Sequence, residues 1–193
     1  MRPVDVPPGR RRRPVAIMRL VLAVLLPIVV FAGLYAFGGS HEPAYTSSLF
    51  GQYGDNANGL KARLGTALLG LALVQLLLAL WMYRRLPGAG RAPAPVRTVH
   101  RLTGLAAFLL SLPIAYHCIT AYGVRLNTTR TAIHSITGCA FYGTFTAKVL
   151  LVRSRRAPGW ALPVAGGSLV TAVALLWYTS ALWWLNGTTV PGL

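Results

Sequence analysis

Long uncharged apolar stretches are the feature that most constrains how this chain folds. Five of them recur along the sequence, each near the length of about 20 residues that a helix needs to cross the hydrocarbon core of a bilayer. Because no water is present there to satisfy backbone groups, each stretch is most simply a helix. We therefore predict an all-α, integral membrane helical bundle with five transmembrane helices, at about residues 18–38, 61–83, 100–122, 131–153 and 160–185.

The composition agrees with lipid as the solvent. Of the 193 residues, 11% are charged and 54% are hydrophobic, whereas a soluble domain has about a quarter of its residues charged. This excludes an ordinary soluble enzyme, and the apolar content excludes an intrinsically disordered chain. We predict a basic, Pro- and Arg-rich cytoplasmic tail at residues 1–16 and a single membrane domain at residues 17–193.

The formal net charge of +16 is concentrated between the apolar stretches. Fourteen arginines lie before the first stretch, between the second and third, and after the fourth, and the opposite side carries Lys61, Arg63, Arg125 and Arg130. The positive-inside rule then places the N-terminus in the cytoplasm and the C-terminus outside. Because this rule accounts for the basic clusters, we expect the lipid bilayer as the partner and no nucleic acid.

Two histidines fall inside predicted spans, where ionisable side chains are costly and often functional. His117 and His134 lie on helices joined by the short loop at 123–130, and we expect these helices to pack as an antiparallel hairpin. Counting outward from the middle of the loop puts both residues at the same depth, roughly one to two helical turns below the outer surface. Two imidazoles at one depth on neighbouring helices are what axial ligation of a haem b requires.

The surroundings of these histidines suit a flat apolar cofactor. Gly138 and Phe141 share the helix face of His134. Arg125 and Arg130 lie in the adjacent loop, where guanidinium groups suit haem propionates and lipid phosphates equally well. The motif of covalent haem attachment, C-x-x-C-H, is absent. We therefore predict one noncovalent haem b with His117 and His134 as iron ligands and with Arg125, Arg130, Gly138 and Phe141 as further binding residues.

His100 is a candidate secondary residue. It lies about 25 Å before His117 along a helix and about 100° away from its face. Since the fourth span has no histidine at the matching inner level, we predict one haem, and His100 either has a structural role or contacts a headgroup or a quinone. We expect Cys118 and Cys139 to be free buried thiols, because Cys139 lies about 9 Å too deep for a disulfide.

Three segments carry a resemblance to known families: HRLTG at 100–104, HC at 117–118 and HSxxGCxFYG at 134–143. They look like an actinobacterial family of five-span membrane proteins of unknown function, over most of the chain from Phe50 onward. This resemblance implies the bacterial cytoplasmic membrane and an association with Rieske-type iron–sulfur proteins. More loosely, HRxxG with a later histidine on the same helix is similar to cytochrome b561 and ferric-reductase membrane domains, which implies haem b and electron transfer from quinol or ascorbate, or to metal ions. Those families provide two helices with two histidines each, whereas the second helix here has only His134.

The leading hypothesis is a haem b-binding electron-transfer subunit, with its haem near the outer leaflet, that links a quinol pool to an external redox partner. No constellation of catalytic acid, base or nucleophile is visible, so we do not expect an enzyme on its own. Two alternatives stay open. A structural or assembly subunit uses its histidines for interhelical hydrogen bonds. A copper-handling or transport protein uses His117, Cys118, His134 and Cys139, because Cu(I) favours thiolate and imidazole ligands.

Overall fold

The structure is a computed structural model, and it describes residues 12–154 and 157–192. The predicted tail at residues 1–16 therefore lies mostly outside the described residues. The described chain is all-α, as expected. Its elements are α1 (Arg12–Ser40), α2 (Gly54–Met82), α3 (Ala94–Tyr122), α4 (Thr129–Arg153), α5 (Ala161–Leu176), the π-helical segment η1 (Trp177–Leu182) and α6 (Trp183–Leu185).

Four of these helices are long and apolar enough to cross a membrane: α2, α3, α4 and the continuous segment Ala161–Leu185. Only 11% of the most apolar part of α2 is buried inside the protein, so most of its apolar side chains need lipid as their partner. In α1 the described apolar part, Val24–Ser40, is shorter. The chain is therefore a multi-pass membrane protein with four helices of spanning length among the described residues.

The second spanning helix begins earlier than predicted. The predicted span starts at about residue 61. In the structure α2 begins at Gly54, whose positive φ of 52° turns the chain into the helix. Asp55 lies in the first turn, where a carboxylate interacts favourably with the helix dipole. As a consequence, Lys61 lies about 10 Å inside α2.

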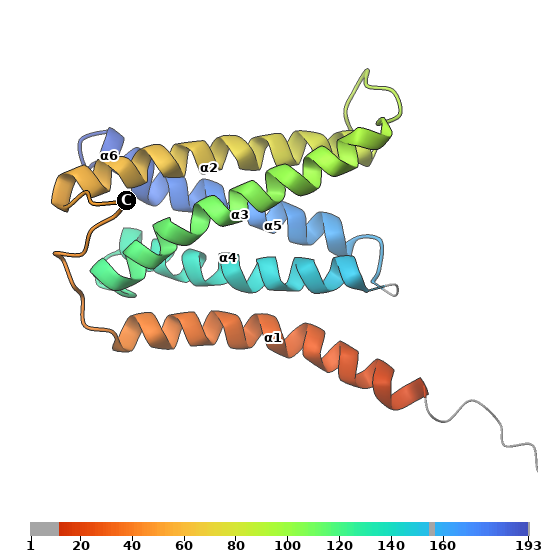
Figure 1. Cartoon of the computed structure of the whole chain (residues 1–193), viewed down its shortest axis with the longest axis horizontal. Helices are drawn as coiled ribbons and strands as arrows, with labels where there is room; N and C mark the ends of the chain where they lie inside the picture. Colours follow the sequence, from red (N-terminus) through yellow and green to blue (C-terminus); the bar gives the residue numbers. More distant parts are fainter. Residues whose placement is uncertain (1–11, 155–156, 193) are drawn as a thin grey trace, which may run out of the picture.

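The helices run alternately up and down, and their connections gather at two ends of the bundle (Figure 1). One end, here called the cavity end, has the loops at 41–53 and 123–128 and the residues after α6. The other end, here called the basic end, has the loop at 83–93 and the end of α4. The arginines at the basic end include Arg84, Arg85, Arg91 and Arg153, which confirms their predicted grouping on one side.

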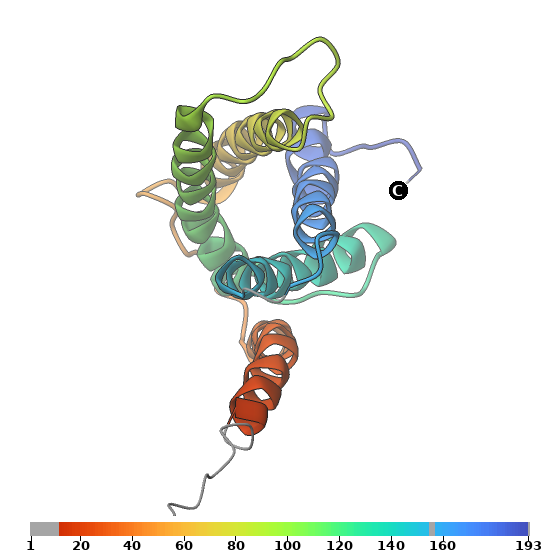
Figure 2. The same ribbon diagram turned by 90° about the vertical axis from the view of Figure 1, so that its right-hand side faces the viewer.

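Viewed from its end, the bundle is a ring of α2, α3, α4 and α5, with α1 outside the ring beside α4 (Figure 2). The closely packed pairs are α1 with α4, α4 with α5, α2 with α3, and α2 with α5 and η1. The helices α3 and α4 are not among them, although they are consecutive, antiparallel and in side-chain contact, so the expected hairpin is present with a wider spacing of the two backbones. Aromatic side chains hold them apart, since Phe108 stacks on Phe145 at 4.2 Å and the Tyr142 hydroxyl donates to the Ser111 carbonyl at 3.1 Å.

The helix α4 packs more closely against α1 than against α3, and it does so through a small residue. A Cβ atom on Gly143 would lie 2.8 Å from the carbonyl oxygen of Pro27, so only glycine allows this approach. Small residues at such contacts are the usual device of membrane helices. Within the ring, the buried core consists of Leu68, Ala72, Phe141, Leu169 and Val173.

Candidate functional site: a cavity at one end of the helix ring

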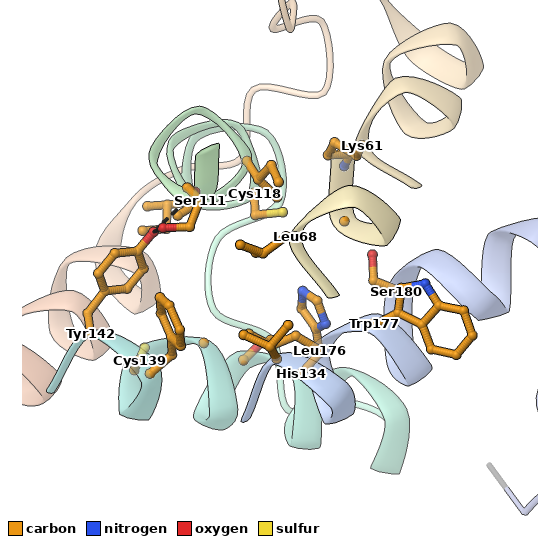
Figure 3. Close-up of a pocket in the computed structure, with 18 of the residues that line it drawn as sticks. Lys61, Leu68, Ser111, Cys118, His134, Cys139, Tyr142, Leu176, Trp177 and Ser180 are labelled. Atoms are coloured by element: carbon orange, nitrogen blue, oxygen red, sulfur yellow. Dashed lines mark hydrogen bonds between the residues drawn. The ribbon is translucent and has the colours of Figure 1, made fainter. Parts of the chain in front are cut away.

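A cavity of about 130 Å³ lies inside the ring, toward the cavity end. Its walls come from α2, α3, α4, α5 and η1, and Leu34 of α1 also contributes (Figure 3). The lining is mostly apolar, and Cys118 and Cys139 are part of it. The more polar side chains in the wall are Lys61, Ser111, His134, Ser135, Tyr142 and Ser180. The cavity is thus an apolar space with a few polar groups, which is the usual composition of a small-ligand site.

His134 projects from α4 into this cavity (Figure 3), and its tautomer follows from its partner. Its Nδ1 lies 2.9 Å from the Thr179 hydroxyl oxygen. That hydroxyl donates its only proton to the Leu175 carbonyl at 2.7 Å, so it must accept a proton from His134 Nδ1. The proton of His134 is therefore on Nδ1, and Nε2 carries a lone pair.

Thr179 makes a second contact with α4. Its carbonyl oxygen accepts a hydrogen bond from the Arg130 guanidinium at 2.8 Å, one turn before His134 on the same helix. Thr179 is fully buried and lies in η1, where the π-helical spacing changes which backbone groups pair. Arg130 also covers the Trp183 ring, with its guanidinium carbon 3.9 Å from the ring centroid. One residue of η1 thus positions both Arg130 and His134.

His117 has a different environment. Its ring is 2% exposed and its Nε2 lies 3.1 Å from the Ser47 carbonyl oxygen. Because a carbonyl only accepts, Nε2 carries the proton. Nδ1 is buried and has no hydrogen-bond partner among the described residues. His117 is packed against the loop at 41–53 and is not part of the cavity wall.

The predicted common depth of the two histidines agrees with the helix bounds. His117 lies five residues before the end of α3, and His134 lies five residues after the start of α4. Each is therefore about 7 Å from the helix terminus at the cavity end. The histidines share a level but face different surroundings.

Of the six residues predicted to bind a cofactor, the structure brings three to the cavity: His134, Gly138 and Phe141. His117 and Arg130 have the partners described above. Arg125 donates from Nε to the Tyr122 carbonyl at 3.1 Å and also contacts the Tyr45 hydroxyl. Its backbone is tied to the Ser135 hydroxyl. Both arginines thus hold loops and helix ends together.

Lys61 was not predicted as a site residue, yet it is 8% exposed and lines the cavity. Its Nζ lies 4.3 Å from the centroid of the Tyr122 ring. No carboxylate of the described residues forms an ion pair with it. The sequence contained a reason to consider Lys61, because an ionisable side chain within a span is a default candidate for function. The predicted helix start at residue 61 had placed it at the surface.

The cysteines and His100 do not form a further centre. Cys118 and Cys139 are free thiols, as predicted, with Cys139 buried and Cys118 partly so. No group of three or more His, Cys, Asp or Glu side chains placed to hold a metal ion occurs in residues 12–154 and 157–192. His100 lies toward the basic end, where its carbonyl accepts a bond from Gln75 at 2.7 Å. Its predicted contact with a headgroup or quinone stays a prediction.

Together, the ring and its cavity define a multi-pass helical membrane protein with a partly open, mostly apolar site. Residues 19–192 match the model of DUF6529, a family of unknown function, and the chain belongs to that family. No curated protein matches the chain. No solved structure matches it either. The resemblance to an uncharacterised family is thereby supported, and the looser resemblance to cytochrome b561 and ferric-reductase domains gains no support.

Proposed function

We propose that this chain is the membrane-embedded subunit of an electron-transfer system and that it holds its redox group in the cavity beside His134. One observation carries the proposal. The hydrogen bond to Thr179 fixes the proton of His134 on Nδ1, so the lone pair of Nε2 is free in a mostly apolar cavity. An imidazole oriented in this way by a second residue is typical of histidines that bind metals or cofactors.

The redox group predicted from the sequence is one noncovalent haem b between His117 and His134. The residues fit this group only in part. His134 is oriented as an axial ligand, whereas His117 donates to Ser47 and lies outside the cavity wall. A cavity of about 130 Å³ compares with the roughly 150 Å³ that holds one benzene molecule, and a porphyrin is several times larger. In this arrangement the cavity does not accommodate a haem with both ligands, and haem b stays a prediction for spectroscopy.

The proposal adds a fifth membrane-spanning helix to the four that are long and apolar enough to cross. We propose that α1 also crosses the bilayer, since it runs alongside α4 over much of its length (Figure 1). With five spans, the basic end faces the cytoplasm by the positive-inside rule, and the cavity end faces outward. The host membrane is then a bacterial cytoplasmic membrane. The partners are a quinone in the lipid and a redox protein, Rieske-type or other, at the outer face.

The test is a search for a redox group in the full chain purified in a mild detergent. Absorption spectra before and after dithionite reduction detect haem, and solvent extraction followed by chromatography detects quinone. We expect a redox group that His134→Ala loses and His100→Ala retains, because His100 lies toward the basic end. If neither haem nor quinone copurifies, and neither binds on addition to the purified protein, the electron-transfer proposal is wrong.

A second candidate function is favoured by the hydrogen bonds themselves. His117, His134, Arg125 and Arg130 all have partners on other segments, which for Arg125 is the Tyr45 hydroxyl. This is what a structural or assembly subunit requires, because such bonds join membrane helices without any cofactor. Isolation of the protein in a fixed ratio with another membrane protein, with no redox group bound, supports this candidate instead.

A further inference from the structure

Lys61 is a largely buried residue, and no carboxylate of the described residues pairs with its ammonium group. It lies in α2 with 8% of its surface exposed, and its recorded contact is with the face of the Tyr122 ring. The chain has three acidic residues, and the two that the structure describes, Glu42 and Asp55, are exposed. The cation–π contact leaves the N–H donors of the ammonium group without an acceptor among the described residues. A ligand oxygen in the cavity would accept from them.

The cavity offers a second polar group with the opposite role. The Nε2 atom of His134 has a lone pair and therefore accepts a proton, whereas the Lys61 ammonium donates. A hydroxyl group has both capacities, because it can donate its proton to the imidazole and accept from the ammonium. A carboxylate has no proton to give and leaves His134 Nε2 unpaired. A hydroxyl therefore matches both groups, whereas a carboxylate matches Lys61 alone.

The volume sets the size of the group that carries this hydroxyl. About 130 Å³ is close to the roughly 150 Å³ of a cavity that takes up one benzene ring. The walls around it are apolar, with Leu68, Ile114, Val173 and Leu176 among the lining side chains. A six-membered aromatic ring with a hydroxyl substituent matches the size, the apolar walls and the two polar groups together.

We propose that the cavity binds the ring of a lipid-soluble phenol, with the phenolic hydroxyl held between Lys61 and His134. A quinol headgroup has this chemistry, and so has a phenol that does not take part in electron transfer. The inference rests on the proposed function in that it names the ligand class of the same cavity. It concerns binding alone and requires no redox step.

The experiment uses 4-decylphenol, a phenol with an apolar tail that is not a quinol. Binding to the full chain in detergent is followed by quenching of tryptophan fluorescence, since Trp177 lines the cavity. The methyl ether of the probe keeps the ring and the tail but lacks the proton that His134 accepts. We expect the ether to bind at least tenfold more weakly, which is the usual consequence of leaving one buried polar group unpaired. Phenol without the tail tests whether the ligand comes from the membrane or from water.

Variants locate the binding site. Lys61→Met and His134→Leu should each weaken 4-decylphenol binding about tenfold or more. The matched controls are Lys148→Met and His100→Gln, which change the same residue types elsewhere on α4 and α3 and should leave the affinity within about twofold. Circular dichroism confirms that the variants remain helical. Equal binding of the phenol and its methyl ether, or equal losses in Lys61→Met and Lys148→Met, would overturn the inference.

The outcome separates the two proposals. If a redox group copurifies but 4-decylphenol binds without dependence on Lys61, the electron-transfer proposal stands and the phenol site is wrong. If Lys61 and His134 govern phenol binding but no haem or quinone is ever bound, the phenol site stands and the electron-transfer proposal is wrong.

Discussion

The face of α3 that the loop at 41–53 covers and the cavity-lining face of α4 each carry a histidine at the same level. The two histidines have different hydrogen-bond partners and different surroundings. His117 is packed with its proton donated to the loop at 41–53, whereas His134 is oriented by Thr179 with its free nitrogen toward an open space. Equal depth on consecutive helices therefore does not make a pair of ligands. What distinguishes the two residues is the partner that holds each ring.

The largest expected difference lies in stability. His117→Ala removes a fully packed ring and leaves the Ser47 carbonyl without its donor, so we expect a loss of about 3 kcal/mol in the free energy of unfolding. His134→Ala should cost about 1 kcal/mol, because its ring already borders a cavity and Thr179 keeps its bond to Leu175. Thermal unfolding of the two detergent-solubilised variants, followed by circular dichroism, measures this. Equal losses would remove the contrast between the two faces.

A smaller change tests what orients His134. Thr179→Val keeps the shape of the side chain but removes the hydroxyl, so His134 Nδ1 loses its acceptor. We expect a cost of about 1 kcal/mol in stability and weaker 4-decylphenol binding, since the ring is no longer held in one tautomer. Thr179→Ser retains the hydroxyl and should bind like the unaltered protein. The Arg130 contact uses the backbone carbonyl of Thr179, so it remains in both variants.

The membrane fold was largely predictable because lipid imposes long apolar helices. The all-α class, the four long spans and the grouping of arginines at one end all follow from apolar length and charge position. The wide spacing of α3 and α4 did not follow, because it depends on where bulky and small residues face. Phe108 and Phe145 lie between these helices, while Gly143 turns the opposite face of α4 toward α1. Sequence spacing alone cannot assign such faces.

The site was predictable in part for a related reason. His134, Gly138 and Phe141 share one face of a single helix, so helical periodicity was enough to group them. Lys61 required the true start of α2, and Thr179 required a π-helical segment that shifts the register of the last span. Neither is encoded in a local motif. The role of His117 depended on a loop 70 residues earlier in the chain, a contact that pattern reasoning does not reach.

The smallest expected effect on stability is that of Ser47→Ala. This variant tests whether the backbone carbonyl of Ser47 or its side chain holds the loop against His117. His117 bonds to the carbonyl of Ser47, while the Ser47 hydroxyl is buried without a hydrogen-bond partner among the described residues. Ser47→Ala therefore removes an unsatisfied polar group and leaves the contact to His117 intact. We expect a gain of up to about 0.5 kcal/mol in stability, measured by the same thermal unfolding. A loss comparable to that of His117→Ala would mean that the loop is held through the Ser47 side chain and that the carbonyl contact is not what packs His117.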